Sequence, residues 1–101
     1  MTVKEFAKYV IDNLHRASLV NAFNIGDKLD NPNYYSLEDF INECLLYITD
    51  LLSRSKINTN IYGKLIIALS NCEKAIKSEF KFNRRMIIDN LIIEMWEAYG
   101  H

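Results

Sequence analysis

Glycine and proline are scarce in this chain, with three and one among 101 residues. Tight turns depend on these two residues, so their scarcity argues against an all-β fold with many hairpins. Long apolar runs are also missing: none approaches the roughly 20 residues that span a bilayer. We therefore expect no membrane partner, and the short length predicts one domain over residues 1–101.

An excess of positive charge is absent as well. Twelve basic residues stand against thirteen acidic ones, which gives a formal net charge of −1. Proteins that bind duplex nucleic acid usually gain most of their affinity by neutralising phosphates with a basic excess. We therefore expect no direct contact with nucleic acid.

Residues that build reactive or metal-binding sites are few and scattered. His15 and His101 have no partner at ligand spacing, and Gly26, Gly63 and Gly100 are too isolated to form a phosphate-binding loop. We expect no metal, cofactor, small-molecule ligand or catalytic residue, and hence no enzyme.

The two cysteines, Cys44 and Cys72, fall inside apolar helical patterns, which predicts buried free thiols. The N-terminal stretch is amphipathic and carries Lys4, Glu5 and Lys8, so it does not resemble a secretory signal. We therefore expect a cytoplasmic location.

What the sequence does have is apolar residues at helical spacing, separated by capping residues. Thr2 with Glu5 forms a capping-box pattern, and Ser18, Ser36 and Asn83 are expected N-caps. Asn58 or Thr59 is expected to cap a further helix. These signals predict an all-α, five-helix bundle with helices over residues 2–16, 18–30, 36–54, 59–79 and 84–98.

Five apolar residues lie outside the core-facing stripes of these helices. One interpretation is that they are core residues a few tens of degrees from their expected positions. The other is that they form a surface for another protein, where tryptophan and methionine are enriched. Three of the five share the last helix, which favours the second interpretation. The candidate interface residues are Leu46, Ile67, Met86, Ile93 and Trp96.

Arg84 and Arg85 open the last helix and allow two interpretations. In one interpretation they contact an anion, nucleic acid or a partner's carboxylate, and in the other they are two solvated side chains beside a capped helix start. We include both residues in the candidate interface, and the sequence leaves their role open.

The stretch "ALSNCEKAIKSEFKFNRRMIIDNLIIEMWE" resembles the end of the bacterial DNA polymerase III delta-prime subunit family, a clamp-loader component. Cys72–Ile76 matches a helix of the type Ile/Leu-x-x-x-Glu-x-Ala, Asn83 matches the following Asn, and Leu91–Ile93 matches the closing apolar run. Upstream, "FINECLLYITDLLSRS" and "NAFNIGDKLD" are similar to earlier helices of that family. Thr49 stands where an Arg is common, and Lys81 replaces an expected Asn.

The resemblance covers about residues 10–97 and implies the C-terminal collar domain of that subunit. Family members are AAA+ proteins whose collar helices pack with those of the other clamp-loader subunits, while ATP and the sliding clamp are bound elsewhere. It implies a role in DNA replication as a protein–protein assembly domain, with a natural protein that begins well before Met1. The alternative is a free-standing small helical adaptor or homodimeric regulator, with Met1 as the native start.

Overall fold

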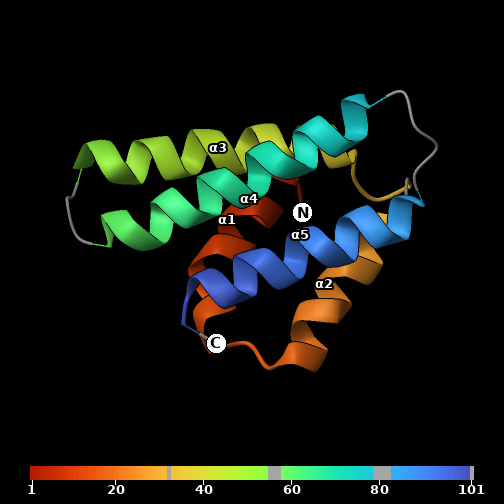
Figure 1. Ribbon diagram of the computed structural model, residues 1–101, viewed down its shortest axis with the longest axis horizontal. Helices are drawn as coiled ribbons and strands as arrows, with labels where there is room; N and C mark the ends of the chain where they lie inside the picture. The colour runs from red at the N-terminus through yellow and green to blue at the C-terminus, as the bar shows by residue number, and fades with distance from the viewer. Residues whose placement is uncertain (32, 55–57, 79–82, 101) are drawn as a thin grey trace.

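The computed structural model describes residues 1–31, 33–54, 58–78 and 83–100 (Figure 1). Within these ranges the chain forms helices and connecting turns and no strand, which confirms the predicted all-α, five-helix bundle. A short 3₁₀ helix, η1, continues the first helix. The elements are α1 (Val3–Asn13), η1 (Leu14–Arg16), α2 (Leu19–Asp30), α3 (Leu37–Arg54), α4 (Thr59–Lys77) and α5 (Arg84–Ala98).

When η1 is counted with α1, the observed helix bounds lie within two residues of the predicted ones. This agreement reflects helix starts that are encoded locally. Thr2 and Glu5 exchange hydrogen bonds of 3.1 and 3.0 Å as a capping box. The side chain of Ser18 accepts from the amide of Asn21 at 3.2 Å, and that of Asn83 accepts from the amide of Arg85 at 2.9 Å. The predicted end of the fourth helix at Glu79, and Lys81, lie outside the described residues.

The start of α4 differs from the expectation in one respect. Asn58 is the N-cap residue, but its backbone is left-handed with φ of 63°, and its side chain makes no capping hydrogen bond. Asparagine tolerates this conformation better than most residues, so Asn58 shapes the turn before α4. The side-chain cap predicted for this helix is therefore absent.

Four helices form one layer, and the fifth lies behind it. Figure 1 shows α3, α4, α5 and α2 following one another across the view, with neighbouring helices in contact. The helix α1 packs against α3 on the inner side of this layer. The core therefore lies between the layer and α1. Its largest fully buried side chains include Phe6, Phe40, Leu65, Leu69, Ile92 and Met95.

Both cysteines are buried and unbridged, as predicted. Burial raises the pKa of the Cys72 thiol to about 11 and also raises that of Cys44, so neither thiol ionises near neutral pH. Two residues at the helical spacing of buried neighbours are themselves largely exposed: Tyr9 is 49% and Leu19 41% accessible. Tyr9 faces a groove beside α2 because α1 and α2 diverge from their shared turn.

Candidate assembly surface

The helix α5 buries one face and exposes the opposite one. Ile88, Leu91, Ile92 and Met95 are buried in the core. Met86, Asn90, Ile93 and Glu97 recur at intervals of four and three residues, so they share the face that points away from the core. Met86 is 61% exposed. The side chain of Ile93 is half-buried. The predicted two-faced character of this helix is thus present at these positions.

Leu46 and Ile67 occupy the corresponding outward positions on α3 and α4. Their side chains are 64% and 61% exposed, respectively. Each lies on the opposite side of its helix from buried residues such as Cys44 and Ile48 on α3 and Leu65 and Leu69 on α4. Both therefore point away from the core, as the helical spacing predicted.

The grooves between neighbouring helices place these outward residues relative to one another. The α3–α4 groove brings Ile41 and Asn42 to the level of Glu73 and Ile76. The α4–α5 groove brings Ala68 to the level of Glu94, and likewise aligns further pairs along the two helices. Because each pair of helices runs antiparallel, these pairings put Leu46, Ile67 and Ile93 within about one helical turn of the same level.

The structure therefore gathers four of the predicted interface residues on one side of the molecule. Leu46, Ile67 and Ile93 lie in a row across three adjacent helices, and Met86 lies two turns further along α5. We call the surface formed by Leu46, Ile67, Met86 and Ile93 the outer apolar face.

Charged residues that the sequence analysis did not single out surround this face. Lys64 and Lys74 are exposed on α4, about one turn before and two turns after Ile67. Glu94 and Glu97 are exposed on α5 beside Ile93. Among the described residues, none of these four takes part in an ion pair. A helical-wheel projection of the sequence could have shown that lysines lie on the outer side of α4 and glutamates on the outer side of α5.

Trp96 does not belong to the outer apolar face. Its side chain is half-buried against the core, and its indole Nε1–H donates a hydrogen bond of 2.9 Å to the carbonyl oxygen of Ala17. Ala17 lies 79 positions earlier, in the turn between η1 and α2. Trp96 therefore joins α5 to that turn within the chain, and an interface role for it remains a prediction.

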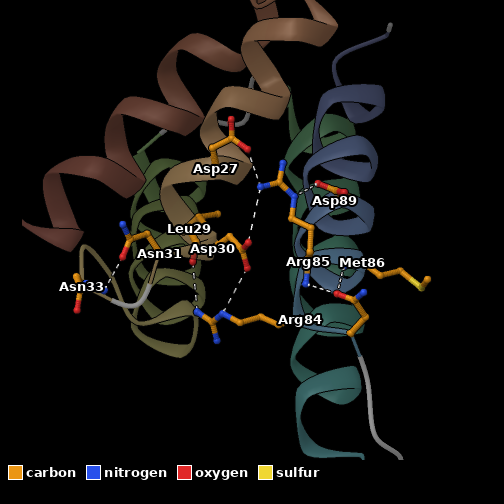
Figure 2. Close-up of polar contacts among 10 residues, drawn as sticks. Asp27, Leu29, Asp30, Asn31, Asn33, Arg84, Arg85, Met86 and Asp89 are labelled. Atoms are coloured by element: carbon orange, nitrogen blue, oxygen red, sulfur yellow. Dashed lines mark hydrogen bonds and ion pairs between the residues drawn. The ribbon is translucent and has the colours of Figure 1, made fainter.

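Arg84 and Arg85 also make contacts within the chain, as Figure 2 shows. One terminal nitrogen of Arg85 lies 2.6 Å from the carboxylate of Asp27, and its Nε donates to Asp89 at 3.0 Å. The Asp27 hydrogen bond is the main cause of the raised pKa of Arg85. Arg84 donates to the carbonyl oxygen of Leu29 at 3.3 Å and lies 4.0 Å from Asp30.

These residues form a charge cluster between α2 and α5, which we define as Asp27, Asp30, Arg84, Arg85 and Asp89. Both arginines extend from α5 towards α2, along the side of α5 that faces away from α4 (Figures 1 and 2). Neither sequence interpretation described this arrangement, because the aspartates on α2 lie more than fifty positions before the arginines. An additional role in an interface remains a prediction for both.

No protein-family model, curated protein or solved structure matches this chain. Within the described part of the chain, no group of histidine, cysteine or acidic residues is arranged to hold a metal ion. None of the described helices is both long enough and apolar enough to cross a membrane.

Proposed function

We propose that this chain is a non-catalytic assembly domain that binds another protein through its outer apolar face. The observation that carries the proposal is the exposure of Leu46, Ile67 and Met86 on three adjacent helices, with Ile93 between them. Isolated exposed apolar residues are common on soluble proteins, but several on one side of a domain are typical of interaction sites.

The energies favour a partner that covers several helices. Burial of each large apolar side chain contributes about 1.5–3 kcal/mol. Association costs roughly 4–15 kcal/mol, so these side chains alone would barely offset that cost. A stable interface buries about 800 Å² on each partner, which is more than one helical stripe offers. The proposed partner therefore packs across α3, α4 and α5 together.

The resemblance to the delta-prime family suggests which partners these are. We propose the other subunits of a DNA polymerase III clamp loader, which would meet this chain through their own collar helices. The domain would then hold the ATPase modules of the complex in place during DNA replication and perform no chemistry itself. The buried free thiols of Cys44 and Cys72 are compatible with a reducing compartment, and we propose the cytoplasm.

A second candidate function is a homodimeric regulator or adaptor. It is favoured by the charges around the outer apolar face, with Lys64 and Lys74 on α4 and Glu94 and Glu97 on α5. A two-fold axis through this face would bring the basic helix of one copy against the acidic helix of the other. The charges of such a surface are self-complementary, and the collar proposal does not require this property.

Size-exclusion chromatography with light scattering tests both proposals. The chain is run alone and mixed with the C-terminal domains of the other clamp-loader subunits from the same genome. A complex that forms only in the mixture supports the collar proposal, and a dimer of the chain alone supports the second candidate. A monomer under both conditions contradicts assembly through this face.

Substitutions then locate the interface. Ile67→Asp and Met86→Asp each place a charge on the outer apolar face and are expected to weaken the complex at least tenfold. Val20→Asp is the matched control, because Val20 is 70% exposed on α2, away from this face. Equal affinities for all three variants would contradict the proposed location.

A further inference from the structure

Another groove lies between α1 and α2, away from the outer apolar face. It has a volume of about 500 Å³. Its apolar lining includes Phe6, Ala17 and Ile25, and Tyr9 stands half-exposed at its edge. We propose that this groove is a docking site for an acidic, amphipathic segment of another protein.

Charge complementarity carries this proposal. The groove is lined by two cationic side chains, Arg16 and Lys28, and by no carboxylate. Lys28 forms no ion pair with any described residue, and the guanidinium of Arg16 donates to the side-chain oxygen of Asn13, which is neutral. The chain as a whole has a net charge of −1, so this local positive charge is not a general property of its surface.

The two cations lie towards opposite ends of the groove. Arg16 comes just before the turn that joins η1 to α2, so it lies at the closed end of the groove. Asn21, Asn24 and Lys28 recur along the α2 wall, and Lys28 is two helical turns beyond Asn21. At 1.5 Å per residue, Lys28 lies about 10 Å beyond Asn21 along this wall. An acidic side chain towards each end of the bound segment would therefore meet Arg16 and Lys28 in turn.

The remaining lining residues favour a polypeptide over other anions. Asn21 and Asn24 can each donate and accept hydrogen bonds, as side chains and backbone of a peptide require. The apolar floor offers burial to an aliphatic or aromatic side chain between the two carboxylates. Nucleic acid fits poorly, because two cations neutralise few phosphates.

Selection from a random 16-residue peptide library displayed on phage, with the intact chain as target, tests the proposal. We expect selected peptides to be enriched in acidic residues and to contain at least one large apolar residue. In heteronuclear NMR titrations, the synthesised peptides should shift amide signals of α1 and α2. The double variant Arg16→Glu with Lys28→Glu should bind them at least tenfold more weakly.

Two further variants test whether the charge of the groove itself determines peptide affinity. Asn24→Glu adds a carboxylate to the groove without removing a cation, and it should also weaken binding. Arg54→Glu with Lys77→Glu makes the same charge change on α3 and α4, outside the groove, and should leave peptide affinity unchanged. Amide spectra of each variant establish that it is folded, which is expected because these side chains are exposed.

Several results would overturn the proposal. These are selected peptides without acidic enrichment, equal affinity for the charge-reversed variant, or signal shifts confined to α3, α4 and α5. Binding of a single-stranded oligonucleotide or inorganic phosphate in the groove, with no peptide bound there, would assign it to another ligand. The groove variants leave Ile67 and Met86 intact, so this result is separate from the test of the assembly proposal.

Discussion

At the scale of single residues, aromatic side chains at the edge of the core connect α1 and its flanking turns to distant parts of the chain. The hydroxyl of Tyr99 donates to the carbonyl oxygen of Ile11 at 2.7 Å, and that of Tyr47 donates to the carboxylate of Asp12 at 2.7 Å. The indole N–H of Trp96 likewise donates to the carbonyl oxygen of Ala17. Each such bond contributes about 0.5–1.5 kcal/mol and leaves a polar group unsatisfied if the donor is removed.

Two of these tyrosines predict a loss of stability at alkaline pH. Burial, together with the neighbouring Asp12, raises the pKa of Tyr47 to about 12, and burial raises that of Tyr99 above its usual range. In the unfolded chain tyrosine ionises near pH ~10. Above that pH the folded chain keeps protons that the unfolded chain releases, so the free energy of unfolding falls as pH rises.

The double variant Tyr47→Phe with Tyr99→Phe should therefore lose less stability between pH 9 and pH 12 than the wild type. Urea unfolding followed by circular dichroism at several pH values measures this difference. At pH 7 the variant should be less stable than the wild type, because two hydrogen bonds are missing. Parallel pH curves for the two proteins would contradict the assignment.

At the scale of elements, α5 is held by different interactions on its two sides. Towards α4 it makes apolar contacts, and Ile87 and Leu91 line a groove there together with Ala68, Cys72 and Ala75. Towards α2 the contacts include the charge cluster.

Arg85→Gln should destabilise the protein by about 0.5–1.5 kcal/mol, because Arg85 is only 33% exposed on its side chain and pairs closely with Asp27 and Asp89. Arg84→Gln is the matched control and should cost less than about 0.5 kcal/mol, since its ion pair is longer and more exposed. Urea unfolding at low and high NaCl measures both, and the effect of Arg85→Gln should shrink with salt. A cost for Arg85→Gln no larger than that for Arg84→Gln would show that the closer pairs of Arg85 do not contribute more than the longer pair of Arg84.

At the scale of the whole molecule, α5 closes the core. It contributes Ile88, Leu91, Ile92 and Met95 to the buried interior and lies between α2 and α4 in the layer (Figure 1). Without these side chains, buried leucines such as Leu29, Leu65 and Leu69 would become exposed to solvent. The fold therefore depends on the last fifteen-residue helix.

A chain that ends at Asn83 should consequently have no cooperative unfolding transition. Its amide NMR spectrum should lose the dispersion of the full chain, and denaturant unfolding should become gradual. Addition of a synthetic peptide covering residues 84–101 should restore part of both signals. A cooperative transition in the truncated chain alone would mean that the first four helices form a core of their own.

The helices and their core-facing stripes could be predicted because both depend on residues three or four positions apart. Leu46, Ile67 and Met86 were expected outside the stripes, and each is exposed. Local spacing alone would place Tyr9 beside the buried Phe6 and Val10, but the divergence of α1 and α2 leaves its side chain exposed. Trp96 and Arg85 could not be placed, since their partners lie 79 and 58 positions away.

The sequence by itself determined where helices start, which faces are apolar, and that the chain forms an all-α bundle. Capping and helical spacing depend on residues close in the sequence, so they can be recognised without knowledge of the fold. Only the tertiary structure decided that Leu46, Ile67, Met86 and Ile93 share one side, and that the arginines of α5 face α2. Both outcomes depend on the order and antiparallel register of packed helices, which contacts between distant segments establish.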